Sequence, residues 1–212
     1  MAKVIIAGAT GLVGEHVLSL LCKDNRISSI TVLARRQPPF NSAKTSFVKT
    51  DFSCFQKISD TYDWAFCCLG STRKKAGSRS EFIKVDLEYV YQYAKYCKSI
   101  GVKNFAVVSS FGADRKSLFF YFRVKGEMES QLASLGFDRL LIYRPSLLIG
   151  KRHKARFMEG MLQKFFLLSQ KILGPFRCFL GTKVSDLSYK MVSDIFINHP
   201  EKKVVFTPKS LC

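Results

Sequence analysis

The sequence lacks the features of a metal-binding, disulfide-stabilised or membrane-spanning chain. Its seven cysteines are odd in number and form no CxxC pair, and its three histidines lie far apart. This pattern argues against a zinc framework or a disulfide scaffold and predicts a reducing, cytoplasmic environment. No run of about 18 apolar residues occurs, so no transmembrane helix is expected. The N-terminal segment also lacks the pattern of a signal peptide.

Acidic residues are scarce: 16 Asp and Glu stand against 34 Lys and Arg, which gives a formal net charge of +18. Basic residues are densest after Gly150. Such a surface attracts phosphorylated cofactors, nucleic acid or anionic lipid, unless the charges merely face water. Specific nucleic-acid binding is not expected, because the sequence contains no RNA-recognition, zinc-finger or helix-turn-helix pattern.

Short apolar runs alternate with helical patterns along the 212 residues. This alternation predicts βαβ units and an α/β fold with a doubly wound parallel sheet. We expect a single domain over residues 1–212, in which residues 151–212 form a smaller lobe on the substrate side. The expected strands are Lys3–Gly8, Ile30–Ala34, Ser46–Lys49, Trp64–Leu69, Asn104–Ser109, Arg139–Tyr143 and Lys203–Phe206. The expected helices are Leu12–Cys22, Glu81–Ile100, Phe119–Leu135, Ala155–Leu173 and Leu187–Ile197.

A glycine-rich turn follows the first expected strand, with the spacing GxxGxxG. Gly8 permits the turn, Gly11 lets the backbone approach a pyrophosphate, and Gly14 lets the next helix pack on the strand. The free N–H groups at that helix start favour phosphate. The segment therefore predicts a Rossmann-type dinucleotide site whose first contacts are Gly8, Thr10, Gly11, Leu12, Val13 and Gly14.

Two arginines stand where an NAD-preferring site carries an acidic residue for the ribose. Arg35 and Arg36 end the second expected strand, and a guanidinium pairs well with a 2′-phosphate. We therefore expect NADP(H) to be favoured over NAD(H), the alternative being two solvated arginines.

Two further loops are predicted to touch the cofactor. Asp51, beside Phe52, follows the third strand and is suited either to accept from the adenine amino group or to cap a helix. Leu69, Gly70 and Ser71 follow the fourth strand, where a small residue lets backbone lie against a ribose.

A serine, a tyrosine and a lysine form the expected catalytic set. Ser110 follows the fifth strand, and Tyr121 and Lys125 share one helix face at i and i+4. Tyrosine can deliver a proton to a carbonyl oxygen, and a nearby ammonium lowers its pKa. A second YxxxK copy at Tyr91 and Lys95 precedes the serine strand, and we treat it as a coincidence.

The order GATGLVG, CLGST, VVSS, YFRVK and YRPSLL resembles an atypical short-chain dehydrogenase/reductase with extended-type glycine spacing. Residues 1–152 most resemble the oxidoreductase family named after the HIV Tat-interactive protein 2. This resemblance implies Ser-Tyr-Lys roles for Ser110, Tyr121 and Lys125, with Lys125 also holding the nicotinamide ribose. It implies that Asp86 replaces an asparagine which supports a proton relay in many relatives. The implied nicotinamide loop contributes Pro145, Leu147 and Leu148.

These features predict an NADP(H)-dependent oxidoreductase acting on an unidentified carbonyl or alcohol substrate. The alternative is an NADP(H)-binding regulatory or scaffold protein without turnover, although such proteins usually lose the tyrosine or the lysine. Phenylalanines after Gly150 indicate an apolar small-molecule substrate. The basic, apolar-striped helix Ala155–Leu173 is expected either to cover the substrate side and touch anionic membrane, or simply to pack on the core.

Overall fold

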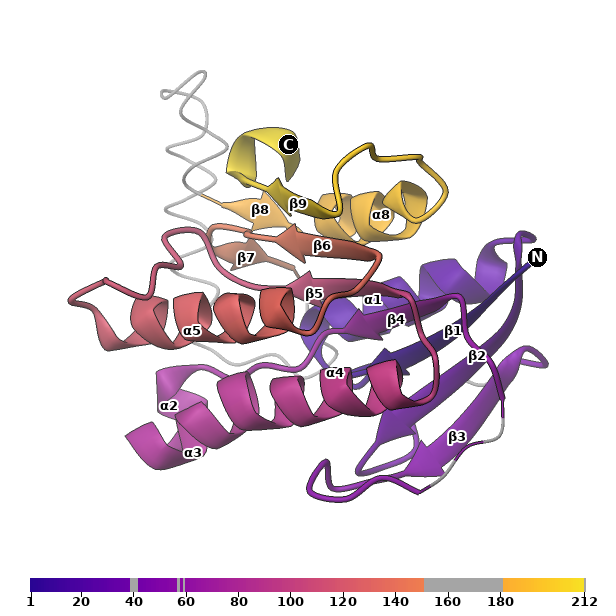
Figure 1. The fold of residues 1–212 in the computed structure, drawn as a ribbon, viewed down its shortest axis with the longest axis horizontal. Coiled ribbons are helices and arrows are strands. Elements are labelled where there is room, and N and C mark those ends of the chain that lie inside the picture. The colour runs from indigo at the N-terminus through magenta and orange to yellow at the C-terminus, as the bar shows by residue number, and fades with distance from the viewer. Residues whose placement is uncertain (39–41, 57, 59, 151–180, 212) are drawn as a thin grey trace.

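The central element of the computed structural model is a seven-stranded parallel sheet (Figure 1). The structure describes residues 1–38, 42–56, 58, 60–150 and 181–211. Across the sheet the strands run in the order β3-β2-β1-β4-β5-β6-β9. Their bounds are β1 Ala2–Ala7, β2 Ile27–Ala34, β3 Thr45–Lys49, β4 Trp64–Cys67, β5 Asn104–Val108, β6 Arg139–Tyr143 and β9 Lys203–Phe206.

Helices cover both faces of this sheet, because alternate strand residues point to opposite sides. Val4 and Ile6 of β1 join the core under α1 (Leu12–Lys23) and α8 (Val184–Asp194). Ile5 and Ala7 join the core under α4 (Tyr89–Ser99) and α5 (Phe120–Ser134). Figure 1 shows α4 and α5 side by side on one face. The expected doubly wound α/β fold is confirmed.

The strand order reverses its direction of travel beside β1. From β1 the chain passes outward to β2 and β3, then returns to β4 on the other side of β1 and continues to β5 and β6. The carboxyl ends of β1 and β4 therefore flank a topological switch point. Open α/β sheets bind ligands in the crevice at such a point.

The long helix predicted over Glu81–Ile100 is wrong in its details. The structure has α3 (Arg79–Ile83), a π-helical turn η1 (Lys84–Glu88) and then α4. A π turn adds one residue to one turn, and apolar periodicity does not reveal such an insertion. Ser78 caps α3 by accepting the Glu81 N–H at 3.1 Å, and the short helix α2 (Arg73–Ala76) was not predicted.

Several strands end earlier than predicted. Gly8, Leu69 and Ser109 lie in the loops just after β1, β4 and β5, because the parallel pairing of these strands stops before them. These loops gather at the carboxyl edge of the sheet. Gly8, the Leu69–Ser71 loop and Ser110 thus lie just beyond the paired part of the sheet.

The C-terminal region contributes to the same sheet. The predicted strand Lys203–Phe206 pairs with β6, and η3 (Pro208–Leu211) follows it. Two short strands, β7 (Leu148–Ile149) and β8 (Thr182–Lys183), pair separately. The helix expected over Ala155–Leu173, with its lid and membrane roles, lies outside the described residues, and the single-domain assignment stays a prediction.

Candidate active site

The glycine turn is built around close backbone contacts between β1, β4 and α1. Gly8 has a φ of +83°, and a Cβ there would lie 2.4 Å from the Cys68 carbonyl carbon. A Cβ on Gly14 would lie 2.1 Å from the Gly8 oxygen, whereas one on Gly11 would meet its nearest atom, the same oxygen, at 3.2 Å. Gly8 and Gly14 are therefore required by packing. Gly11 has more room, which fits its expected role beside a ligand.

The start of α1 presents N–H groups that no side chain caps. Gly11 is the N-cap residue and has no side chain that could accept them. Thr10 is exposed and Leu12 half-buried, while Val13 is buried in the core. Uncapped N–H groups and the helix dipole favour an anion at this position. The turn therefore fits the diphosphate of a dinucleotide. Val13 stabilises the helix by packing into the core.

Arg35 and Arg36 follow the carboxyl end of β2, next to β1. Both side chains are exposed. Neither guanidinium makes a hydrogen bond or ion pair with any residue in the described part of the chain. Two cations without internal partners remain able to receive a ligand phosphate.

The loop after β3 only partly matches its expected role. Hydrogen bonds from the Ser53 side chain and backbone to Asp51 Oδ1, at 2.7 and 2.9 Å, hold the pKa of this exposed carboxyl below its usual value. Asp51 thus closes a local turn and caps no helix among the described residues. Phe52 has a φ of +70°, and its side chain packs against Phe55 and Tyr89 in the core. The Phe52 side chain therefore lies in the core, and a contact between this residue and the cofactor stays a prediction.

The two serines after β5 differ in their surroundings. Ser109 is buried and donates its hydroxyl to Glu129 Oε1. Ser110 is half-buried, and its hydroxyl donates to the carbonyl of the next residue, Phe111, at 3.2 Å. The Ser109 hydroxyl is already bonded to a buried carboxylate, so its role is structural. Ser110 is therefore the one that remains available to a ligand.

Tyr121 and Lys125 lie one turn apart in the first half of α5. Tyr121 is half-buried against the ring of Phe82, with centroids 5.5 Å apart. Lys125 is only 4% exposed. Burial alone would lower the pKa of its ammonium, but the negative charge of Asp86 outweighs burial and raises that pKa above its ordinary value.

Asp86 approaches Lys125 from the π turn η1. Its Oδ1 lies 2.8 Å from Lys125 Nζ, and its side chain is fully buried. Oδ2 accepts the Ser71 N–H at 2.7 Å. A Cβ on Gly70 would lie 3.3 Å from Asp86 Oδ1 and 3.7 Å from Lys125 Nζ. The Leu69–Ser71 loop, predicted to border the cofactor ribose, therefore rests directly on this ion pair, which the sequence had not revealed.

A second charge pair, between a buried glutamate and a half-buried arginine, fixes the other end of the site. Arg144 donates two hydrogen bonds to Glu129, from Nε at 2.9 Å and from Nη2 at 2.5 Å. Glu129, one turn beyond Lys125 on α5, thereby connects the ends of β5 and β6. Sequence reasoning missed it, although its i+4 spacing from Lys125 placed it on the same helix face.

The predicted nicotinamide loop begins immediately after Arg144. Pro145 is buried, Leu147 is 58% exposed, and Leu148 begins β7. Of these three residues, Leu147 offers an apolar side chain to an incoming molecule.

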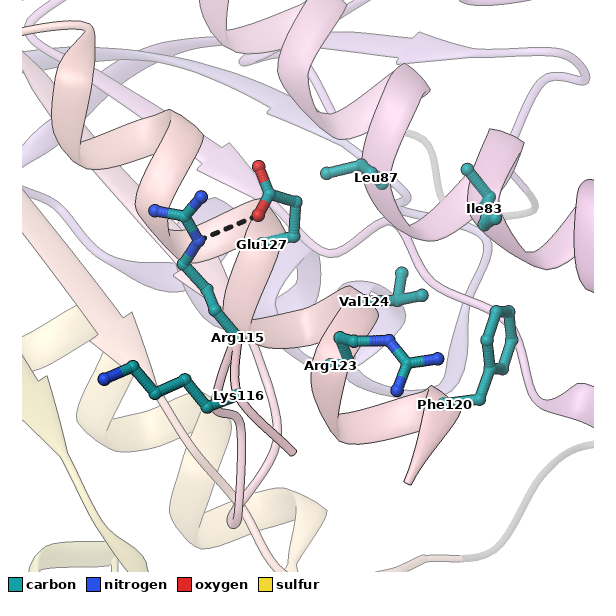
Figure 2. A pocket seen from close by; sticks show the side chains of 8 residues that line it. All are labelled: Ile83, Leu87, Arg115, Lys116, Phe120, Arg123, Val124 and Glu127. Carbon is teal, nitrogen blue, oxygen red and sulfur yellow. Dashed lines mark hydrogen bonds and ion pairs between the residues drawn. The ribbon is translucent and has the colours of Figure 1, made fainter. Parts of the chain in front are cut away.

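A separate groove of about 660 Å³ lies between α5 and the α3–η1 segment (Figure 2). Figure 2 shows the ion pair between Arg115 and Glu127, 2.9 Å apart, along this groove. The residues that line the groove do not include Ser110, Tyr121 or Lys125. The groove therefore belongs to a different face of α5 from the expected catalytic residues. Its lining residues are Ile83, Leu87, Arg115, Lys116, Phe120, Arg123, Val124 and Glu127.

The second YxxxK copy has a structural explanation. Tyr91 and Lys95 lie on α4, where the Lys95 ammonium is 5.7 Å from the Tyr91 ring centroid and its side chain is exposed. Neither residue contacts the Asp86–Lys125 pair. Their spacing is accounted for by a surface cation–π contact.

Other kinds of site find no support within the described ranges. No group of three potential ligands there is arranged to hold a metal ion. The cysteines placed by the structure are free. In the same ranges, no helix has both the length and the apolar character needed to span a membrane.

Sequence relatives confirm the resemblance inferred from the motifs. Protein HTATIP2 of Rattus norvegicus is 38% identical over 170 residues, which cover 77% of this chain and 70% of the relative. The Aspergillus niger protein fmp52, mitochondrial, is 34% identical over 181 residues, covering 81% and 77%. FMP52 relatives from several fungi are named mitochondrial proteins. This finding overturns the cytoplasmic location expected from the cysteine pattern. Cysteine content reflects the redox environment of a protein and does not identify its subcellular compartment.

Solved structures share the fold at low identity. A UDP-glucuronic acid 4-epimerase from Bacillus cereus, in complex with NAD, has a TM-score of 0.68 at 14% identity and covers 97% of this chain and 78% of its own. The UDP-Glc/GlcNAc 4-epimerase of Campylobacter jejuni has a TM-score of 0.69 at 16% identity, covering 100% and 82%. The profile of the NAD dependent epimerase/dehydratase family matches residues 4–167. Because the family profile covers most of the sequence and the relatives share more than a third of their residues with it, the chain belongs to the NAD dependent epimerase/dehydratase family.

Proposed function

We propose that this protein is an NADP(H)-dependent oxidoreductase that interconverts a carbonyl and an alcohol. The observation that carries the proposal is the buried cation Lys125 beside the loop after β4, with Tyr121 one turn before it on α5. That loop adjoins the glycine turn at the switch point of the sheet. Structural neighbours solved in complex with NAD support a dinucleotide at this edge.

The side chains can divide the reaction between them. The nicotinamide of a bound dinucleotide supplies or accepts the hydride at carbon. Ser110 donates a hydrogen bond that holds the carbonyl oxygen, and the Tyr121 hydroxyl gives that oxygen its proton. The ammonium of Lys125 stabilises the phenolate left on Tyr121 and can hold ribose hydroxyls.

The preference for NADP(H) rests on Arg35 and Arg36. Both are exposed at the end of β2 without internal partners in the described chain. The test is a fluorescence titration of the wild type with NADPH and NADH, repeated with Arg35→Ala/Arg36→Ala. We expect tighter NADPH binding in the wild type and a loss of about 1–3 kcal/mol in the double variant, as for hydrogen bonds to charged groups. Equal wild-type affinities would reject the preference.

An apolar substrate fits the residues around the start of α5. Phe111 is 41% exposed and Phe119 is 71% exposed, and both flank the loop that leads to Tyr121. Leu147 adds a third exposed apolar side chain on the predicted nicotinamide loop. A panel of apolar and polar aldehydes and ketones of matched size tests this choice. Equal turnover of the polar compounds would contradict it.

The second candidate is an NADP(H)-binding regulatory protein without turnover. The observation in its favour is Asp86, a carboxylate at the position where many short-chain dehydrogenases carry asparagine. An anion paired to Lys125 offsets the positive charge that would stabilise a phenolate on Tyr121. Dinucleotide binding without reduction of any compound on the panel is the outcome that favours this candidate.

A further inference from the structure

Asp86 is a buried carboxylate that the proposed chemistry does not use. Its side chain is fully buried, and it contacts the Lys125 ammonium and the Ser71 N–H. Oδ1 lies 2.8 Å from the Lys125 ammonium and receives no hydrogen bond from any other described residue. An ionised carboxylate is costly to bury without a counter-charge, which makes the contact with Lys125 a requirement of the fold.

The π turn η1 carries Asp86 to this position. Its residues, Lys84–Glu88, centre on Asp86, and α helices flank the turn on both sides. A π turn changes the direction of the side chains within a helix, and such turns occur often at functional sites. The helix path is thus altered at the point where a carboxylate meets the lysine.

The charged and titratable groups around Asp86 and its partner Lys125 come from two neighbouring elements. On α5 they are Lys125 and Tyr121, and on β4 the group is the buried thiol of Cys67. Only Lys125 is a cation. A neutral residue at position 86 would leave this ammonium buried without its counter-charge.

We propose that Asp86 is a positioning residue that keeps Lys125 charged and ties its ammonium to the Leu69–Ser71 loop. The catalytic meaning of this role rests on the proposed function, in which Lys125 serves Tyr121 and the cofactor ribose. Asp86 touches neither substrate nor cofactor and acts through Lys125. Its carboxylate keeps the lysine an ammonium, and its second oxygen fixes the loop against which the ribose is expected to lie.

Two substitutions separate these two effects. Asp86→Asn removes the charge but keeps an oxygen that can accept the Ser71 N–H, whereas Asp86→Ala removes both. Lys125 is followed through the ¹³Cε chemical shift in labelled protein, assigned with Lys125→Met. We expect Lys125 of the wild type to stay protonated beyond pH 10.5, the ordinary lysine value. In Asp86→Asn it should titrate at least about one pH unit lower, because the main charge that opposes the effect of burial is then gone.

Hydrogen exchange at the Ser71 amide measures the second effect. Exchange should stay near the wild-type rate in Asp86→Asn and rise by about tenfold or more in Asp86→Ala, as for loss of a hydrogen bond worth about 1.4 kcal/mol. Identical Lys125 titration in the wild type and Asp86→Asn would overturn the proposal. So would identical Ser71 exchange in the wild type and Asp86→Ala.

A variant that fails to fold still gives a decisive result. If Asp86→Asn does not fold, the double variant Asp86→Asn/Lys125→Met should fold, because it removes the stranded ammonium. A double variant no better folded than Asp86→Asn contradicts the pairing. The proposed function fails separately: a wild type that binds neither NADPH nor NADH rejects it, while the Lys125 titration still decides the role of Asp86.

Discussion

The glycine turn and the first half of α5 form the candidate site by opposite means. The turn consists of residues close together in sequence, and it functions through the absence of side chains at Gly8, Gly11 and Gly14. The α5 region consists of buried charges from distant segments, such as Asp86 with Lys125. A backbone cradle depends on steric fit, whereas a buried polar cluster depends on every partner being present. Substitutions in the two regions should therefore fail in different ways.

The largest effect is expected at the proton donor. Tyr121→Phe removes the hydroxyl without changing the ring that packs on Phe82. Turnover should fall by about 10²–10⁴-fold, the usual contribution of general acid catalysis, while NADPH affinity stays unchanged. Reduction rates over the carbonyl panel and a cofactor titration provide the measurement. Tyr91→Phe is the matched control, and full activity in Tyr121→Phe would refute the assignment.

Loss of the second buried carboxylate on α5 should unfold the protein more easily. Glu129→Ala leaves Arg144 and the Ser109 hydroxyl without their partner. The free energy of unfolding in urea should fall by about 3 kcal/mol, as when one member of a buried pair is removed.

The same helix supplies the control for this change. Glu127 pairs with Arg115 at 2.9 Å near the surface, where the arginine side chain is 60% exposed. Glu127→Ala should cost less than about 1 kcal/mol. Similar losses in Glu127→Ala and Glu129→Ala would show that burial does not distinguish the two pairs.

Substitutions at two glycines of the turn, Gly11 and Gly14, should separate effects on stability from effects on cofactor binding. Gly14→Ala forces a Cβ against the Gly8 carbonyl and should cost about 2 kcal/mol of stability, a typical penalty for overpacking. Gly11→Ala has more room and should change stability little, yet place a methyl group where the pyrophosphate is expected. Thermal unfolding and NADPH titration of both variants test this. Full NADPH affinity in Gly11→Ala would remove Gly11 from the cofactor site.

The last effect is absent at neutral pH and grows gradually at alkaline pH. Burial raises the pKa of the Cys67 thiol, on β4 between the two regions, from 9.0 to about 12. Because the folded state holds this proton more tightly, the stabilisation is complete below pH 9 and is lost as the pH rises from 9 towards 12. The free energy of unfolding should therefore fall above pH 9, by up to about 1.4 kcal/mol per pH unit from this thiol.

Slopes, and not absolute stabilities, identify this contribution. Cys67→Ala leaves a small cavity and lowers stability at every pH, but its decline above pH 9 should be shallower than that of the wild type. Cys54→Ala, at an exposed cysteine, should keep the wild-type slope. Equal slopes in all three proteins would contradict the shift.

The two regions also differ in how far the sequence predicted them. The sequence predicted three features, because each follows from local spacing or strand order. They are the glycine spacing, the position of Arg35 and Arg36 after β2, and the order of Ser110, Tyr121 and Lys125. The sequence did not predict the burial of the Phe52 side chain or the π turn, because neither changes the apolar periodicity. The fungal relatives corrected the location, which composition had misjudged.

The sequence by itself determined the sheet, its doubly wound order and the turn at Gly8–Gly14, because strand patterns and glycine spacing act over a few residues. Only the tertiary structure decided which charges meet. Asp86 and Lys125 are 39 positions apart, and Glu129 meets Ser109 and Arg144 from three different elements. Such pairs depend on how η1, α5 and the strand ends pack together. The physical reason is that burial makes an unpaired charge costly, so the packed core, and not the local sequence, selects its partner.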